Sequence, residues 1–254
     1  LLEHASRNFK NHTGIALTTK VLVIREERQP FSDYGTDNIE TMLQLPTDKL
    51  ALESSNNIKQ TLDLEKLSKE LTVVSLTSID TIKLPFTEYY FEEFNKLKHI
   101  QLRNVNIFNP LPNTILPSLP LTLIKIKKSN VTGEFRFSPS TCSDAPDSKI
   151  FIELHQTNLR SFSFDELLSN STLECNFHID LSDNDYFDPK FLTNQTEKIG
   201  NYNGGNIYIQ LRNVDIDCDC PLYELYKEKR NFIHSVYCKN WGNFLDNITD
   251  CKQY

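Results

Sequence analysis

Features that would place this chain in several familiar classes are missing from its sequence. It has no apolar run near the roughly 18 residues of a membrane-spanning helix, and its most apolar stretch, residues 115–126, is interrupted by Pro117 and Pro120. With a formal net charge of -7 and a pI near 5.4, it also lacks the excess of Lys and Arg that binding to phosphate backbones requires. We therefore expect no nucleic-acid partner, and membrane attachment only through a segment outside this chain.

Motifs for catalysis and cofactor binding are also missing. The sequence contains no G-x-S-x-G, no P-loop, no H-E-x-x-H and no G-x-G-x-x-G. The aspartates between Asp180 and Asp188 lack the glycine and the closing Glu of a calcium-binding loop, so we interpret them as a solvated edge. We expect no enzymatic activity, no metal and no cofactor. The only residues that would support an enzymatic role are carboxylates without an assigned function.

Cysteine is scarce but patterned. The six cysteines are an even number, and four of them lie in the last 37 positions, which indicates a disulfide framework made in an oxidising compartment. N-glycosylation sequons agree with an extracellular location, although chance alone gives about four at this composition. The five sequons are at Asn11, Asn130, Asn170, Asn194 and Asn247.

Two distant segments share one pattern. Residues 97–107 and 206–216 both contain Ile-Gln-Leu-Arg-Asn-Val. In a repeat frame that counts the start of each unit as position 0, apolar side chains stand at +3, +5 and +10. In the unit that begins at Asn176, for example, Tyr186 stands at +10. The same frame fits units that begin at Thr47, Leu71, Leu121, Lys149 and Asn176, and more faintly one at Thr19.

The starts of successive units are separated by 24 to 30 positions. Such steps are typical of repeats whose short strands stack into a continuous core, because one unit cannot bury its own apolar face. Unrelated strands of a β-sandwich are the alternative, but they have no reason to share one frame. The segments between strands, such as residues 86–94 and 162–168, would fill the interior from the opposite side.

The units resemble the leucine-rich-repeat family, whose pattern is L-x-x-L-x-L-x-x-N. This resemblance implies an α/β solenoid with a curved parallel sheet on its concave face and irregular convex arms, with about eight strands in residues 1–215. The family's Asn at +8 occurs here only as Asn184, which predicts a less regular coil. The other units place Ser55, Val105, Ser129, Thr157 and Val214 there.

Residues 216–254, with Cys218-Asp-Cys220-Pro followed by Cys238 and Cys251, resemble the C-terminal cap of extracellular members of that family. The resemblance implies the disulfides Cys218–Cys238 and Cys220–Cys251. It also implies a short helix over residues 222–226 that seals the core, with Trp241 and Phe244 packed beneath it. A four-cysteine zinc site is the rival interpretation, but a C-x-C pair grips one metal poorly.

Cys142 and Cys175 lie in the loops that follow consecutive predicted strands, so a third bridge is predicted, with two buried free thiols as the alternative. No cysteine-rich cap matches at the N-terminal end, and the chain begins without Met or a signal peptide. We expect this end to be uncapped and the chain to be a processed or cut segment.

Positions +2, +4, +6 and +7 should point outward from the concave sheet. The +4 and +6 columns place a basic middle beside an acidic neighbour, although a plain solvated face is an equal alternative. His155 and His178 are about 13 Å apart along neighbouring strands and cannot share a metal. The candidate ligand-binding residues are Arg103, Lys125, Lys127, Lys128, Glu153, His155, Asp180 and Arg212.

The irregular steps and the cap most resemble Toll-type receptors. This resemblance implies an extracellular, glycosylated ectodomain at the cell surface that binds a protein ligand, a co-receptor or a pathogen-derived ligand in innate immunity, with a possible homodimer. A secreted scaffold, matrix or decoy protein is the alternative. A hydrophobic span of about 20 residues following Tyr254 would favour the receptor.

Overall fold

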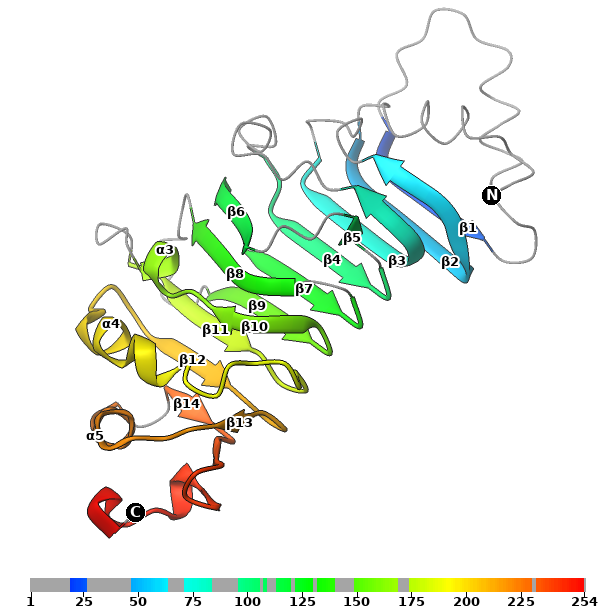
Figure 1. The fold of residues 1–254 in the computed structure, drawn as a ribbon. Helices are drawn as coiled ribbons and strands as arrows, with labels where there is room; N and C mark the ends of the chain where they lie inside the picture. The colour runs from blue at the N-terminus through cyan, green and yellow to red at the C-terminus, as the bar shows by residue number, and fades with distance from the viewer. Residues whose placement is uncertain are drawn as a thin grey trace, which may run out of the picture.

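A computed structural model describes residues 19–26, 47–63, 71–83, 96–105, 107–108, 113–119, 122–129, 132–139, 149–168, 174–229 and 232–253. Its dominant feature is a ten-stranded sheet that runs the length of the described molecule (Figure 1). Nine strands follow one another across this sheet in chain order, and all of its strand pairs are parallel. These strands are β1 (Thr19–Glu26), β2 (Thr47–Asp63), β3 (Val73–Lys83), β4 (His99–Arg103), β7 (Leu123–Lys127), β9 (Lys149–His155), β11 (Asn176–Asp180), β12 (Ile207–Gln210) and β14 (Ile233–His234). The tenth, β5 (Ile107–Phe108), pairs with the end of β3.

Every pairing from β1 to β12 begins in the register that the repeat frame predicts. Thr19 lies opposite Thr47, both at position 0. Leu123 and Phe151, both at position +2, are partners in β7 and β9. The shared frame is therefore confirmed as a structural register, and residues at one position form columns across the sheet.

Side chains at +3 and +5 point into the core because side chains alternate between the two faces of a strand. In β9, for example, Ile152 and Leu154 are fully buried, while Glu153 between them is half-buried. The same pair of positions is buried in the units that contain β3, β7, β11 and β12. The +10 position is less uniform: Leu159 is buried as expected, but the prediction for Tyr186 is wrong, since it is 63% exposed. After β11 the chain runs through turns instead of a strand, and Phe187 enters the core in its place.

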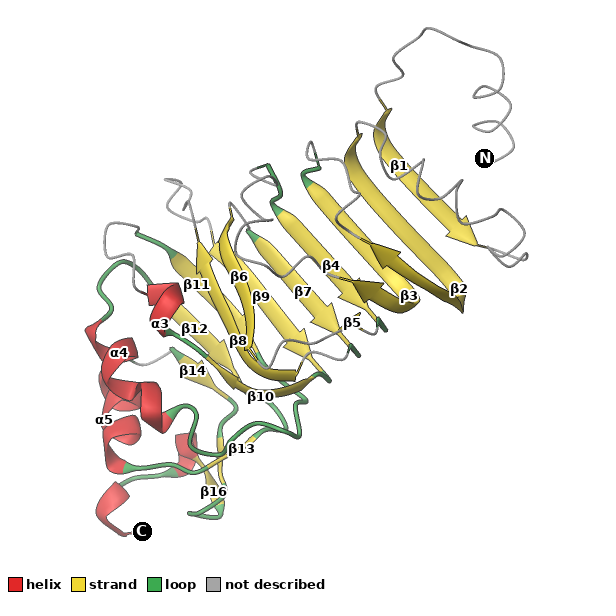
Figure 2. Ribbon diagram, turned by 45° about the horizontal axis from the view of Figure 1, so that its top comes forward, coloured by secondary structure: helices red, strands yellow, loops and turns green. Residues whose placement is uncertain are grey.

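A second parallel sheet covers the core from the other side (Figure 2). Its strand order is β10-β8-β6. The fully buried rings of Phe135, Phe137, Phe162 and Phe164 come from these strands and the following turn, and they close the core. The arm at residues 162–168 thus fills the interior as predicted, whereas residues 86–94 lie outside the described residues. The bounds are β6 (Asn113–Leu119), β8 (Thr132–Pro139) and β10 (Asn158–Phe162), followed by the single-turn helix α3 (Asp165–Leu168).

One backbone conformation recurs after five successive strands. The residue at position +7 has a positive φ between 50° and 61° in each case, a left-handed conformation that favours Asn and Asp among residues with side chains. Three of the five are Asn or Asp, so the local sequence fits the turn. The residues are Asn104, Lys128, Gln156, Asp183 and Asn213.

Position +8, which follows these turns, holds a buried polar side chain that bonds between units at Ser129, Thr157 and Asn184, and a buried Val in two other units. Ser129 accepts a hydrogen bond from the backbone amide of Val105, 24 residues earlier, at 3.2 Å. Its hydroxyl also donates to the Lys127 carbonyl at 2.9 Å. Asn184 makes similar links to Thr157 and Leu154. The missing asparagines are thus partly replaced by smaller polar residues.

The C-terminal segment carries two disulfides, Cys218–Cys238 and Cys220–Cys251, with Cα–Cα distances of 5.3 Å and 5.4 Å. These are the two pairs that the family resemblance implied, and they leave none of the four sulfurs for zinc. Cys175 is also disulfide-bonded. Its predicted partner Cys142 lies outside the described residues.

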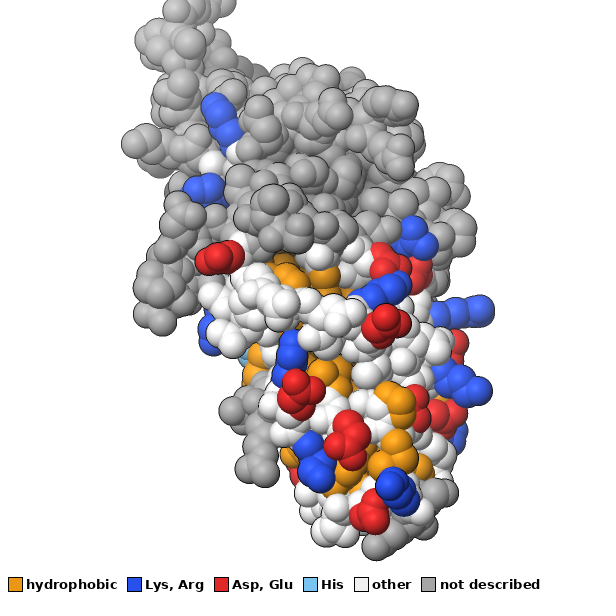
Figure 3. Space-filling view, turned by 90° about the vertical axis from the view of Figure 1, so that its left-hand side faces the viewer, with side chains coloured by type: hydrophobic (Ala, Val, Ile, Leu, Met, Phe, Trp, Pro, Cys, Tyr) orange, Lys and Arg blue, Asp and Glu red, His pale blue; other side chains and the backbone are white. Residues whose placement is uncertain are grey.

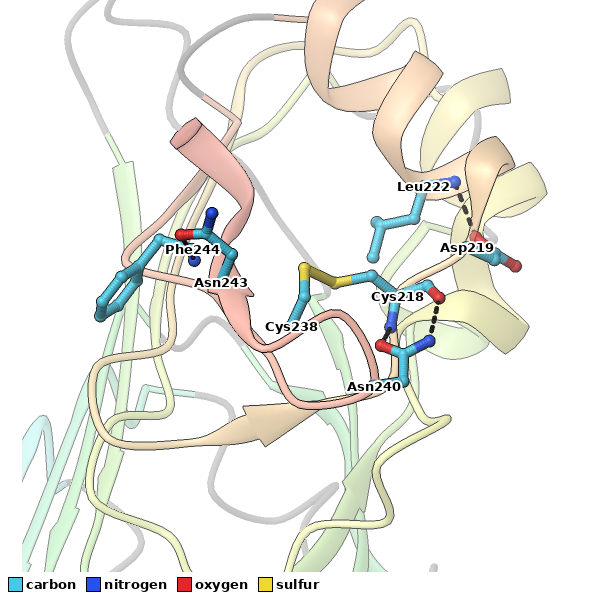
Figure 4. Close-up of a disulfide and its surroundings, with 7 residues drawn as sticks. All are labelled: Cys218, Asp219, Leu222, Cys238, Asn240, Asn243 and Phe244. Carbon is cyan, nitrogen blue, oxygen red and sulfur yellow. Dashed lines mark hydrogen bonds between the residues drawn. A yellow bond between two sulfur atoms is a disulfide. The ribbon is translucent and has the colours of Figure 1, made fainter. Parts of the chain in front are cut away.

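Helix α5 (Cys220–Glu228) contains the predicted segment 222–226. It begins after Asp219, whose side chain accepts a hydrogen bond from the Leu222 amide at 2.8 Å (Figure 4), and Pro221 suits the first turn. Leu222, Tyr223 and Leu225 are buried on one side of this helix, so it covers the end of the core.

The remaining strands of this segment are short. They are β13 (Asp215–Ile216), β15 (Tyr237–Cys238) and β16 (Asn243–Phe244), which form a third sheet. Asn240 fixes the first disulfide, because its side chain accepts from the Cys218 amide at 2.8 Å and donates to the Cys218 carbonyl at 2.7 Å (Figure 4). Trp241 packs against the core, but the prediction for Phe244 is wrong. It is 47% exposed and meets the Tyr237 ring edge-on, because β16 is an edge strand of its small sheet.

Short helices complete the described chain. They are α4 (Thr196–Asn201) and the single 3-10 turns η4 (Thr193–Gln195) and η5 (Leu245–Asn247), with η6 (Cys251–Gln253) at the end. Among the described residues, no helix has the length and apolar character that crossing a membrane requires. Strand β14 belongs to the main sheet although it lies beyond residue 216, and the domain boundary at residue 215 stays a prediction.

Candidate binding face on the open side of the sheet

The outward residues of the main sheet form one continuous face, opposite the second sheet and the helices (Figures 1 and 2). The side that carries α3, α4 and α5 has acidic and basic side chains interspersed, with apolar ones between them (Figure 3). On the open face, cations and carboxylates adjoin one another across neighbouring strands, as Lys125 and Glu153 do at position +4. These charged outward residues make the open face a candidate binding surface.

A hollow of about 520 Å³ lies on this face, over the ends of β3, β4, β7 and β9. Its volume is in the range of sites that hold a small molecule or a few side chains. The charged and titratable residues that line this basic hollow are Arg103, Lys125, Lys127, Lys128, His155 and Asp183. Five of them were expected to bind ligand from the sequence, so the structure brings together most of the predicted set.

Glu153 lies between two of these lysines. Its carboxylate is 2.7 Å from Lys125 Nζ and 3.4 Å from Lys127 Nζ. Partial burial alone would raise the pKa of Glu153, but the hydrogen bonds and positive charges of Lys125 and Lys127 lower it overall. Two of the cations are therefore partly neutralised. Arg103 and Lys128 are exposed, and no described carboxylate lies within ion-pair distance of either.

His155 and Asp180 form a second polar pair beside the hollow. His155 Nε2 lies 2.9 Å from Asp180 Oδ2. Burial by itself raises the pKa of Asp180, but the contact with His155 and the hydrogen bonds from Ser182 outweigh it and lower the pKa to about 2. The Asp180 carboxylate is thus already in contact with His155 and Ser182 of the same chain.

Two predicted members of the outward columns behave differently. Arg212 is exposed and lies outside the hollow, with its guanidinium 3.6 Å from Asp183. Ser182, expected to point outward at +6, is fully buried, which corrects that expectation. The reason is local: its hydroxyl accepts a hydrogen bond from the Arg212 amide at 3.1 Å, so the side chain folds back against the next unit.

The +2 column contains a feature that was not predicted from the +4 and +6 columns. Phe151, His178 and Tyr208 are register partners on β9, β11 and β12, and their rings contact one another in series. His234 on β14 stacks on the far side of Tyr208. The same repeat frame places Lys49, Val73, His99 and Leu123 upstream, so the apolar and aromatic character of this column from Val73 onward was present in the sequence.

Partial burial shifts the histidines of this column in one direction. Burial lowers the pKa of His178, and the nearby Asp180 opposes this effect. Burial also lowers the pKa of His99, where Lys49 and Lys98 act in the same direction. Both imidazoles are therefore biased toward the neutral form, in which the stacking of His178 against Tyr208 involves no unpaired charge.

Two of the five sequon asparagines lie within the described residues. Asn194 and Asn247 are exposed, as a glycosylated asparagine must be, and they lie on η4 and η5, away from the open face. Asn11, Asn130 and Asn170 lie outside the described residues. Within the described part of the chain, no group of three or more His, Cys, Asp or Glu side chains is placed to hold a metal ion.

Compared with protein-family models, with curated proteins and with solved structures, the chain gives no match. The functional assignment therefore depends on the geometry of the open face and on the repeat pattern.

Proposed function

We propose that this chain is a leucine-rich-repeat binding module of the extracellular type. The observation that carries the proposal is the common register of the units, whose starts are 24 to 30 positions apart and of which five have the same left-handed turn after the strand. The buried polar side chains at +8 play the part of the family's asparagines. The two C-terminal disulfides in their implied pairing support the same class.

Within this class, we propose a Toll-type receptor ectodomain that recognises a protein or pathogen-derived ligand. The disulfides suit an oxidising, extracellular environment. The basic hollow gives the open face a defined recognition feature, with exposed cations at Arg103 and Lys128 and an internal Lys125–Glu153–Lys127 cluster. The role is non-catalytic in this proposal, because the charged groups of the hollow fit the recognition of a partner's side chains.

The test is partner capture by the glycosylated chain, displayed on a surface and exposed to extracellular fluid from its own source. We expect a captured protein to be lost with Lys125→Glu/Lys127→Glu. It should be retained with Lys239→Glu/Lys252→Glu, which reverses two exposed lysines in the C-terminal segment. Both variants are first checked by thermal unfolding, since Glu153 would repel new carboxylates beside it. Equal capture by the two variants would refute the use of this face.

A further inference from the structure

Four rings stack in series across the C-terminal half of the open face. The centroid distances are 5.4 Å from Phe151 to His178, 4.5 Å from His178 to Tyr208, and 4.6 Å from Tyr208 to His234. The last two pairs are nearly parallel, with interplanar angles of 15° and 26°. We call this set the ring ladder. It lies on the outward face of the sheet, outside the core, where a partner can reach it.

The stacking decides which part of each ring a ligand can reach. The faces of His178 and Tyr208 are covered by their neighbours, so these rings offer edges to solvent. A sugar ring stacks on an open aromatic face, and the ladder interior does not provide one. Ring edges, by contrast, suit contact with apolar side chains and with carbonyl oxygens, because the edge of an aromatic ring is its positive part. Phe151, at the end of the ladder, is 39% exposed.

The basic hollow adjoins this ladder on the same face. Phe151, Glu153 and His155 alternate with buried residues along β9, so the ladder and the hollow share one strand. Arg103 and Lys128 supply positive charge that no described carboxylate neutralises, which favours an anionic group in the hollow. The carboxylates of Glu153 and Asp183 at the same place would repel a ligand that is negative along its whole length.

We propose that the open face binds an extended peptide segment of a partner protein. An acidic side chain of this segment enters the basic hollow, and an apolar or aromatic side chain packs on the ring ladder. The inference rests on the proposed function, that this face binds a protein, and adds the chemistry of the segment. A peptide can present one isolated acidic side chain and one apolar side chain, whereas a sulfated polysaccharide is negatively charged along its whole length.

The sheet geometry sets the spacing of the two anchors. From Lys125 and Lys127 on β7 to Tyr208 on β12 there are three strand-to-strand steps, which amount to about 14 Å at about 4.8 Å each. Tyr208 at +2 is also two to four positions from these lysines along the strand direction, about 7 to 13 Å, so the anchors are about 16 to 19 Å apart. An extended chain covers about 3.3 Å per residue. The acidic and apolar residues of the segment are therefore expected about five to six positions apart.

The experiment is a selection of random peptides, displayed on phage, against the complete glycosylated chain, followed by affinity measurements on the selected peptides. The expected result is enrichment of Asp or Glu about four to seven positions from Phe, Trp, Tyr or Leu. Affinity should fall at least tenfold with Arg103→Glu/Lys128→Glu and about fivefold or more with Phe151→Ser. Phe244→Ser is the matched control, since Phe244 is a ring of similar exposure, 47% against 39% for Phe151, on the C-terminal segment.

Since ladder variants could affect folding, His178→Ser/Tyr208→Ser is used only if its thermal unfolding resembles that of the unaltered chain, and Phe151→Ser carries the test otherwise. Selected peptides without the acidic–apolar spacing would overturn the proposal. So would binding of heparin that depends on Arg103 and Lys128 but not on the ladder. If a captured partner protein depends on Lys125 and Lys127 yet is unaffected by Phe151→Ser, the ladder inference fails while the proposed function stands.

Discussion

Asn184 Oδ1 accepts two hydrogen bonds from Thr157, one from its backbone amide and one from its hydroxyl, both at 2.8 Å and across 27 residues of sequence. The Nδ2 group of Asn184 donates to the Leu154 carbonyl at 2.6 Å and to the Leu181 carbonyl at 2.8 Å. Both Asn184 and Thr157 are almost completely buried. One amide side chain thus joins two successive units and satisfies backbone groups that water cannot reach.

Replacing Asn184 with Ala should therefore destabilise the fold strongly. The change leaves a buried amide and buried carbonyls without partners, and we expect a loss of about 3 kcal/mol in the free energy of unfolding. Urea denaturation measures this loss, with the exposed Asn201→Ala as control. A double-mutant cycle with Thr157→Val should show coupling, and additive effects of the two changes would contradict the direct link.

Gly205→Ala tests the close approach between two units. A Cβ at this position would lie 2.3 Å from the backbone carbonyl oxygen of Cys175, so the backbone must shift. We expect a loss of about 2 to 3 kcal/mol in stability, measured by thermal or chemical unfolding. Gly200→Ala is the matched control, because its Cβ would make only an ordinary 3.7 Å contact with Leu225. Similar effects of the two changes would argue against the clash.

Lys229 should stabilise the C-terminal end of α4. Its ammonium group donates to the carbonyls of Ile199, Gly200 and Tyr202 at 3.3, 2.9 and 3.2 Å, at the end of the helix where carbonyls lack intrahelical partners. The Ile199 carbonyl also accepts from the Tyr202 amide. We expect Lys229→Met to cost about 1.5 to 3 kcal/mol. Lys227→Met, at an exposed lysine over the Tyr223 ring, should cost well under half as much. Chemical denaturation of both variants measures the loss in the free energy of unfolding. Equal losses for the two variants would show that Lys229 does not cap the helix.

The stability of the fold should depend on pH through Asp180. Its pKa is lowered from 3.8 to about 2, because the contact with His155 and the bonds from Ser182 outweigh burial. A carboxyl whose pKa is lower in the folded state stabilises the fold fully above pH 3.8, and this contribution is lost as the pH falls toward 2. With solvent screening allowed for, we expect about 1 kcal/mol.

Asp180→Asn should remove this dependence. Denaturation midpoints at pH 5 and pH 2.5 are compared for the variant, for the unaltered chain and for Asp185→Asn, where the replaced carboxylate is exposed. The unaltered chain and Asp185→Asn should lose more stability between these pH values than Asp180→Asn. The same loss in all three proteins would contradict the assignment.

Much of the sheet was predictable because strand periodicity is a local property. Ile152 and Leu154 flank Glu153, and an alternation of this kind that returns after every 24 to 30 positions implies a register without any knowledge of the arms between strands. The column of outward residues follows from the same register. For this reason Arg103, Lys125 and Lys127, which lie on two neighbouring strands, were placed on one face from the sequence and line one hollow in the structure.

Packing between distant segments decided the remainder. Whether Tyr186 or Phe187 entered the core depended on how the chain turns after β11, and whether Phe244 was covered depended on the edge of a three-stranded sheet. The stacking of Phe151, His178 and Tyr208 required rotamers that sequence does not contain. The sequence by itself determined the repeat, the register and the chemistry of each column, because alternation along a strand is local. The tertiary structure alone decided which side chains pair, stack or remain available to a ligand, because these outcomes depend on contacts between residues far apart in the chain.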